Sequence, residues 1–242
     1  KHRTVKYPDG PPVLPDRLRG RPEIAGGRCG RECESCISAC PVGAISRGEG
    51  GPEIDLGRCL FCSACAEACP EGAISFKPEH RMASSSREGL RVGPGSEPKL
   101  ALALESKMRR IFGRSLKLRQ VSAGGCNACE ADVNVLSTVV FDLGRFGVQF
   151  VASPRHADGI LLTGPVSANM SLALRKTWEA VPAPRIVIAC GACAISGGPY
   201  AGHAEVEGGA GGCLPVDLYI PGCPPHPLTT LDGLLRLLGR MA

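Results

Sequence analysis

Short apolar runs alternate with helical patterns over the second half of the chain. Runs bounded by glycine or polar residues are typical of buried strands, and they lie at 116–121, 148–151, 159–162, 185–189 and 216–220. Apolar residues recur at helical intervals between them, near 132–143, 171–180 and 228–238. Strands separated by helices predict an α/β domain with a parallel, doubly wound sheet, whose functional crevice lies outside the carboxyl ends of the strands.

The pattern upstream of this domain is less regular. Residues 1–28 are rich in Pro, Gly and Arg and lack apolar periodicity, which predicts an extended N-terminal arm that lies on a partner or is disordered. Residues 83–98 predict a linker by the same compositional test. In residues 99–112 apolar side chains recur at helical intervals among basic ones. This amphipathic basic helix either covers the core of the domain at 99–242 or docks on a membrane surface or a partner.

Cysteines are concentrated between the arm and the linker. The chain has 14 cysteines; residues 33–46 read CESCISACPVGAIS, residues 62–75 read CSACAEACPEGAIS, and Cys29 and Cys59 lie just upstream of the two runs. This is the spacing of a bacterial-type ferredoxin with two [4Fe-4S] clusters, in which the fourth cysteine of each run binds the other cluster. Residues 29–82 are therefore predicted to form a small α+β ferredoxin-like domain that transfers electrons.

The same spacing assigns ligands to the two clusters. Cysteines two residues apart can surround one corner of a cubane, whereas the proline after the fourth cysteine turns that residue toward the second cluster. Cluster A is predicted on Cys29, Cys33, Cys36 and Cys69, and cluster B on Cys59, Cys62, Cys65 and Cys40. Cys29 and Cys33 are one residue further apart than in the usual pattern, although no ligand is missing. The alternative, a pair of structural zinc sites, does not explain the C-x-x-x-C-P ends.

Composition narrows the class of protein. Hydrophobic residues make up 43% of the chain, enough for a sizeable core in one or two domains. No signal peptide and no 18-residue apolar span is evident, so we expect metal thiolates in a reducing compartment and not a disulfide framework. Few aromatic residues and a net charge of only +5 argue against nucleic-acid binding.

Motifs in the α/β domain resemble a known family. GGCNACE, SPRHADGILLTGPV, GACAISGGPY and PVDLYIPGCPPHP resemble the small subunit of group 4 membrane-bound [NiFe]-hydrogenases of the formate hydrogenlyase type, and more distantly the homologous cluster-bearing subunit of respiratory complex I. KYPDGPP, RGRPE and DLGRCLFCSACAEACP are similar to the ferredoxin-like subunit of the same hydrogenlyase. The chain therefore resembles a fusion of two subunits, with a flavodoxin-like α/β domain after the ferredoxin-like one.

The resemblance implies a third, proximal [4Fe-4S] cluster. Its ligands, carried over from the family motifs, are Cys126, Cys129, Cys193 and Cys223. At the first ligand pair, the family pattern of complex I subunits is a Cys-Cys dipeptide, whereas that of hydrogenases is C-x-x-C followed by Glu. Cys126, Cys129 and Glu130 follow the hydrogenase form.

Several residues near these motifs have two interpretations. Cys190 and Cys213 lie outside the ligand pattern, and we expect them to pack as buried thiols. Glu130 either stabilises a helix start through the helix dipole or takes part in proton transfer at the interface with a catalytic subunit. Arg155 and His156 resemble an interface segment of the family, or are hydrogen-bonded loop residues. The glycines at 208–212 lack the Lys-Ser/Thr of a phosphate-binding loop and predict a flexible connection.

The family resemblance implies an electron-transfer subunit of an oxidoreductase complex with three [4Fe-4S] clusters. Its partners would be a [NiFe] large subunit that interconverts protons and hydrogen, membrane-embedded subunits like those of complex I, and an electron donor such as a formate dehydrogenase or a ferredoxin. The complex would lie on the cytoplasmic side of the membrane, with this chain peripheral to it. Two alternatives stay open: a hydrogenase-related complex without nickel, and a complex I-like quinone or ferredoxin oxidoreductase.

Overall fold

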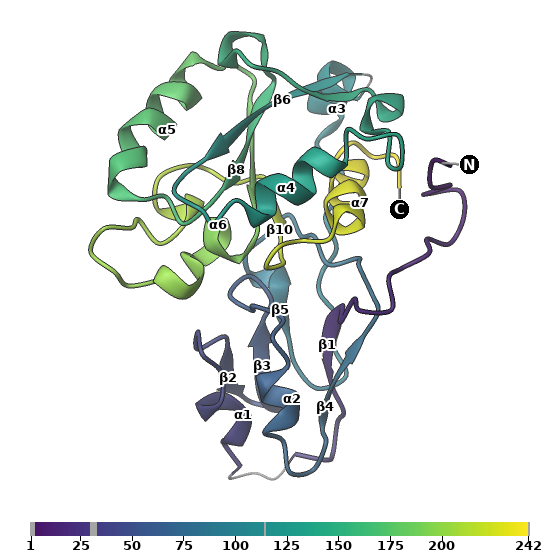
Figure 1. The fold of residues 1–242 in the computed structure, drawn as a ribbon, viewed down its shortest axis with the longest axis vertical. Coiled ribbons are helices and arrows are strands. Elements are labelled where there is room, and N and C mark those ends of the chain that lie inside the picture. The colour runs from purple at the N-terminus through teal and green to yellow at the C-terminus, as the bar shows by residue number, and fades with distance from the viewer. Residues whose placement is uncertain (1–2, 30–32, 114, 242) are drawn as a thin grey trace.

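The computed structural model describes residues 3–29, 33–113 and 115–241. Its α/β domain is built on a five-stranded sheet (Figure 1). The strands are β6 (Leu116–Ser122), β7 (Val148–Phe150), β8 (Gly159–Thr163), β9 (Ile186–Cys190) and β10 (Leu218–Ile220). They are all parallel, in the order β10-β9-β8-β6-β7. Numbered within the domain this is the flavodoxin-like order 2-1-3-4-5, with its switch point between β6 and β8, so the predicted doubly wound fold is confirmed.

Helices cover both faces of this sheet. They are α4 (Ala128–Val135), α5 (Ala168–Ala180), α6 (Ala192–Ser196) and α7 (Pro227–Leu237), with 3-10 turns η2 (Leu143–Phe146), η3 (Pro154–His156), η4 (Gly198–Tyr200) and η5 (Ala210–Gly212). Because side chains alternate along a strand, neighbouring residues of β8 enter different cores. Leu162 belongs to the same core as Leu174 of α5, whereas Leu161 belongs to the core that contains Val133 of α4 and Leu231 of α7.

Two predicted helices have different bounds in the structure. Helix α3 (Ser106–Phe112) is shorter than the predicted 99–112, because the residues before it are extended and bonded elsewhere: Ala101 N–H donates to the Ala83 carbonyl and Leu104 N–H to the Leu237 carbonyl (2.8 and 2.9 Å). Helix α4 starts earlier than the predicted 132–143 and ends at Val135. Beyond it the chain turns through Asp142, which has a positive φ of 47°.

The ferredoxin-like part forms the lower end of the molecule in Figure 1. Strand β1 (Arg21–Ile24) pairs antiparallel with β4 (Ile74–Lys77). A second sheet contains β2 (Ile45–Gly48), β3 (Gly51–Asp55) and β5 (Arg91–Val92). Two one-turn helices, α1 (Ser35–Ser38) and α2 (Ala64–Glu67), each contain the second cysteine of a C-x-x-C pair, Cys36 and Cys65. The predicted ferredoxin-like fold next to an α/β fold is thus present.

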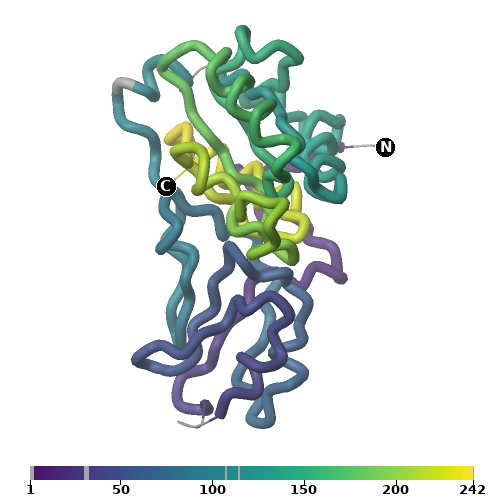
Figure 2. Tube along the Cα trace, turned by 90° about the vertical axis from the view of Figure 1, so that its left-hand side faces the viewer, coloured from purple at the N-terminus to yellow at the C-terminus, as the bar shows by residue number. Residues whose placement is uncertain are grey.

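The N-terminal arm lies on its own chain. At one end, Val5 N–H donates to the Val140 carbonyl (2.8 Å), and Arg145 donates to the carbonyls of Val5 and Tyr7 (2.7 and 2.9 Å). At its other end the arm becomes β1 of the ferredoxin-like part. It therefore runs along both parts of the molecule (Figure 2), where composition alone predicts a segment without internal partners.

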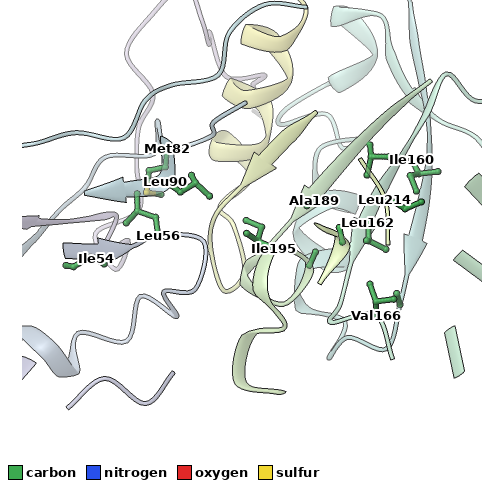
Figure 3. Packing of buried hydrophobic residues seen from close by; sticks show 14 of the residues in the cluster. Ile54, Leu56, Met82, Leu90, Ile160, Leu162, Val166, Ala189, Ile195 and Leu214 are labelled. Atoms are coloured by element: carbon green, nitrogen blue, oxygen red, sulfur yellow. The ribbon is translucent and has the colours of Figure 1, made fainter. Parts of the chain in front are cut away.

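The segment 83–98 is not the loose linker that its composition predicts. Ala83, Leu90 and Val92 are buried, and the segment contains η1 (Glu88–Leu90) and β5, which adds to β3. Figure 3 shows Leu90 beside Leu56 of the ferredoxin-like part, and the same hydrophobic core continues to Ile195 and the sheet of the α/β domain. The two parts therefore share one core. No helix among the described residues is both long and apolar enough to cross a membrane.

Candidate functional site

Twelve cysteines predicted as ligands fall into three groups in space. In the first group, burial raises the pKa of the Cys36 thiol, and the nearby thiols of Cys29, Cys69 and Cys33 raise it further. This group contains the fourth cysteine of the second repeat, Cys69, together with the first three of the first repeat. Cys69 thus lies near the first three cysteines of the first repeat, as crossing-over requires, and the binding of a cluster by these residues stays a prediction.

A second group is formed by the other half of the repeat. Burial raises the pKa of Cys59 to about 12, with further contributions from Cys65, Cys40 and Cys62. Cys40 and Cys69 occupy matching turns: Ala44 N–H donates to Cys40 Sγ and Ala73 N–H to Cys69 Sγ, both at 3.2 Å. Backbone N–H groups aimed at cysteine sulfur are one of the features that set the potential of an iron–sulfur cluster.

The third group lies at the carboxyl ends of the α/β strands. Burial raises the pKa of Cys193 to about 11, and the thiols of Cys223 and Cys126 add to the shift. Cys129 is half-buried, and desolvation of its thiol, followed by the neighbouring Cys190, Glu130, Cys193 and Cys223, raises its pKa. The loops after β6, β9 and β10 therefore bring all four predicted ligands to one place, at the edge where doubly wound sheets bind ligands.

The second and third groups adjoin each other across the two parts of the molecule. Burial raises the pKa of Cys223, and the two thiols that raise it further are Cys126 of its own group and Cys62 of the second group. As whole residues Cys62 and Cys223 are exposed, although protein atoms surround the Cys223 sulfur enough to raise its pKa. No sequence signal predicts this proximity, because it depends on how the two parts pack.

The first pair of the third group has the same backbone turn as its counterpart in the ferredoxin-like part. In Cys62-x-x-Cys65 the residue after the first cysteine, Ser63, has φ 69° and ψ −1°; in Cys126-x-x-Cys129 the corresponding Asn127 has φ 70° and ψ 1°. Both residues directly precede a helix. This left-handed conformation costs energy for a residue with a side chain and is found mostly where function or packing requires it.

Glycines make room for sulfur in the third group. A Cβ atom at Gly191 would lie 2.6 Å from Cys129 Sγ, and a Cβ atom at Gly198 would lie 2.7 Å from Cys193 Sγ. Both glycines also have positive φ. These positions fit a cluster whose sulfur ligands need space and close backbone approach, and thiols kept neutral by burial become thiolates once a metal binds them. Among the described residues, no three His, Cys, Asp or Glu side chains are arranged to hold a single metal ion.

Comparisons with known proteins agree with this division of the chain. Residues 28–74 match the 4Fe-4S dicluster domain, and residues 126–237 match the family described as NADH ubiquinone oxidoreductase, 20 Kd subunit. A probable membrane-bound hydrogenase subunit, mbhJ, from Pyrococcus furiosus is 36% identical over 57% of this chain and 82% of its own length. The chain belongs to the 20 Kd subunit family.

Other relatives in the 20 Kd subunit family have related names. Formate hydrogenlyase subunit 7 from Escherichia coli is 41% identical over 57% of this chain, which spans about half of that protein (54%). An NADH-quinone oxidoreductase subunit from Desulfovibrio desulfuricans is 38% identical over 63% of this chain and 80% of its own length. Relatives thus include subunits named for hydrogenases and for NADH-quinone oxidoreductases.

Glu130 joins three elements beside the third group. Its carboxylate Oε1 accepts hydrogen bonds from Ser122 at the end of β6 (2.5 Å) and from Thr163 at the end of β8 (2.6 Å). Burial by itself would raise the pKa of Glu130, but the two hydroxyl donors outweigh burial and hold the pKa below its ordinary value. The side chain is therefore an ionised anchor at the switch point of the sheet, and its part in proton transfer stays a prediction.

The remaining predicted residues lie in different surroundings. Cys190 is fully buried at the end of β9 and is hydrogen-bonded to Thr230, whereas Cys213 is half-buried beside the Ala210 carbonyl (3.3 Å). Arg155 and His156 are exposed on η3, at the amino end of β8 and so at the opposite edge of the sheet from the third group.

The glycine run at 208–212 is more ordered than a flexible connection. It contains the 3-10 turn η5, and Ala210 is buried in the shared core. A Cβ atom at Gly209 would lie 2.8 Å from the Ala194 carbonyl oxygen, so the run packs against α6. Of its glycines, Gly209 is the one that permits this close approach.

Proposed function

We propose that this chain is an electron-transfer subunit of a membrane-associated oxidoreductase complex of the hydrogenase and complex I type, with three [4Fe-4S] clusters. Clusters A and B would be held by the first and second cysteine groups, and the proximal cluster by Cys126, Cys129, Cys193 and Cys223. When bound, such clusters accept and release single electrons.

The observation that carries the proposal is the approach of Cys62 to Cys223. Cys62 of the ferredoxin-like part is near enough to Cys223 of the α/β part to raise its pKa, which supports passage of electrons between the second and third groups. The shared core holds this arrangement, because Leu56 and Leu90 pack in the same cluster as Ile195, which follows Cys193 in α6. A rigid connection keeps the separation of neighbouring sites constant.

We propose a hydrogenase-type complex as the setting. The C-x-x-C-Glu sequence at Cys126, Cys129 and Glu130 resembles hydrogenase subunits, and two relatives are named for hydrogenases or formate hydrogenlyase. The expected partners are a [NiFe]-hydrogenase-like large subunit against the third group, membrane-embedded complex I-like subunits, and an electron donor at the ferredoxin-like end. The chain would be peripheral, on the cytoplasmic side of the membrane. The relatives named for NADH-quinone oxidoreductase support the second candidate, a complex I-like function without nickel.

Iron content tests the number of clusters. Protein purified anaerobically should carry roughly twelve irons per chain, four for each cluster. Cys126→Ser should lower this to roughly eight, because it removes a ligand of the proximal cluster only. Cys213→Ala is the matched control and should leave the iron content unchanged. A value near eight in the wild type that Cys126→Ser does not alter would remove the proximal cluster from the proposal.

Turnover of the assembled complex tests the order of the sites. Cys62→Ser should abolish activity with the physiological donor but spare activity with a small dye that reacts at the third group. Cys129→Ser should abolish both activities. Full donor-coupled activity in an intact Cys62→Ser complex would place the ferredoxin-like part off the electron path. Two C-x-x-C nickel motifs in the partner large subunit would decide between the hydrogenase and the nickel-free setting.

A further inference from the structure

A cavity of about 470 Å³ lies where the arm, the ferredoxin-like part and the start of α7 meet. Arg17 to Gly20 of the arm form one wall, Leu60 and Phe61 a second, and residues 221–226 a third. Of the twelve proposed cluster ligands, Cys223 is the one that lines it. The cavity is therefore not the space enclosed by any of the three cysteine groups, and its volume is in the range of small-molecule sites.

Two buried polar atoms at this cavity have no hydrogen-bond partner. They are His80 Nε2 and Thr229 Oγ1, and both residues line the cavity. The His80 side chain is 6% exposed and Thr229 is 0% exposed. Buried side-chain nitrogen and oxygen atoms in folded proteins are nearly always hydrogen-bonded. Two such atoms from different parts of the fold at one cavity indicate a polar ligand that bonds to both.

Positive groups prevail around the cavity. Arg17 and Arg19 lie on the arm wall, and the N-terminus of the 11-residue helix α7 begins at the opposite wall. The only carboxylate lining the cavity among the described residues is Glu79, and Arg81 occupies both of its oxygens (2.6 to 3.0 Å). A ligand here should therefore be an anion.

The two histidines at the cavity differ in what they offer to a ligand. His226 Nδ1 accepts from Leu228 N–H (3.2 Å), which places the proton of its neutral ring on Nε2 as a donor. Glu79 Oε1 lies 3.6 Å from His80 Nδ1, beyond hydrogen-bond distance, and its negative charge favours the tautomer with the proton on Nδ1 and an acceptor at Nε2. An anion that fits both rings needs oxygens that accept and a hydroxyl that donates.

We propose that this cavity binds a phosphate group that retains a P–OH, as inorganic phosphate does at neutral pH and as a small phosphomonoester does when it binds as its monoanion. The P–OH donates to His80 Nε2, while the other oxygens accept from Thr229, His226 and the arm arginines. Sulfate has the same shape but carries no proton at neutral pH, so it lacks the bond to His80. This site is additional to the proposed electron-transfer function, although it adjoins the proximal ligand Cys223.

Isothermal titration calorimetry on the intact, anaerobically purified chain tests the site. The probes are inorganic phosphate, glycerol phosphate and sulfate, at constant ionic strength in chloride to hold screening fixed. We expect saturable phosphate binding, and binding of sulfate weaker by about tenfold or more, the effect of one lost hydrogen bond to a charged group. Tighter binding of glycerol phosphate than of phosphate would identify a monoester as the ligand, and the reverse would identify the free ion.

Two variants and two matched controls complete the test. Thr229→Val keeps the shape of the buried side chain and Arg17→Gln changes an exposed one; each should weaken phosphate binding about tenfold. Thr177→Val on α5 and Arg110→Gln on α3 should leave binding within about twofold, because they are surface changes away from the cavity. Arg17→Gln remains decisive if Thr229→Val lowers the iron content through misfolding.

The proposal is overturned if wild-type protein shows no saturable phosphate binding, if sulfate binds equally well, or if both variants bind as the wild type does. A second readout uses the neighbouring cluster and rests on the proposed function. Phosphate should lower the midpoint potential of the centre held by Cys223, because an added negative charge favours its oxidised form, and Arg17→Gln should reduce this shift. Calorimetry does not depend on that centre, so a failed potential shift with intact binding would count against the electron-transfer assignment and not against the site.

Discussion

The hydrogen bond between Tyr7 and Asp232 should control how firmly the arm is docked. Tyr7 O–H donates to Asp232 Oδ1 at 2.6 Å, Tyr7 is 5% exposed, and Asp232 is 0% exposed. Asp232 Oδ2 accepts from Arg236 Nε (2.9 Å), so the carboxylate stays paired when the phenol is removed. Tyr7→Phe therefore keeps the ring and its edge-on contact with His80 but deletes one hydrogen bond to a buried charge.

The size of the effect follows from that single bond. A hydrogen bond to a charged group contributes about 1.5–3 kcal/mol, and about 1.4 kcal/mol corresponds to a factor of ten in an equilibrium constant. Tyr7→Phe should therefore raise the population of the undocked arm about 10- to 100-fold. The α/β sheet does not depend on this bond, so its own stability should change little.

Hydrogen–deuterium exchange read by mass spectrometry measures this opening directly. The Val5 amide donates to the Val140 carbonyl, so a peptide covering residues 3–9 reports arm release. We expect its exchange to accelerate by the factor above, whereas a peptide from β6 should exchange as in the wild type. Tyr200→Phe, at a tyrosine that is 51% exposed, is the matched control. Unchanged protection at residues 3–9 in Tyr7→Phe would refute the reasoning, as would equal acceleration in β6.

Three further outcomes are expected. Burial, followed by the bond to Asp232, raises the pKa of Tyr7, so the docked arm keeps a neutral phenol. The docking of the arm is therefore fully stable below the free-phenol pKa of about 10 and weakens at higher pH. Subtilisin should cut the wild-type arm faster above that pH, whereas Tyr7→Phe should show no such increase. Gly191→Ala should cost the protein about a third of its iron, because the new Cβ meets Cys129 Sγ, whereas Gly211→Ala, which has open space, should lose none. Cleavage at a protease site inserted between Gly95 and Ser96 should leave two pieces that elute together without denaturant, since the core spans both; separation of cluster-bearing pieces would show that the shared core does not hold them.

Sequence patterns predicted the elements that are determined by residues close together in the sequence. The strands β8 and β9 are buried along their whole length, so each appears as an apolar run between polar residues. The cysteine spacing predicted sets that the structure also brings together, although their binding of clusters stays a prediction. Both successes rest on residues that are close in sequence or on a repeat.

Segments held by isolated contacts were not predictable in this way. The arm is held by Tyr7, whose partner Asp232 lies 225 residues away, and nothing in the proline- and glycine-rich sequence around it marks the bond. The segment 83–98 has the composition of a linker, yet Leu90 and Val92 are buried because β5 completes a sheet begun by β2 and β3. His80 and Thr229 come to line one cavity only because three segments that are distant in the sequence meet there.

The large sequence separation between the arm and its partners also determines when the arm can dock during synthesis. Thr4 bonds to the Val139 carbonyl, 135 residues later, and Tyr7 bonds to Asp232 near the end of the chain. The arm is synthesised long before its partner Asp232, and contacts of such separation form slowly. A nascent chain that stops before α7 would therefore present an undocked arm, and proteases or chaperones would meet this exposed segment only in chains that lack α7.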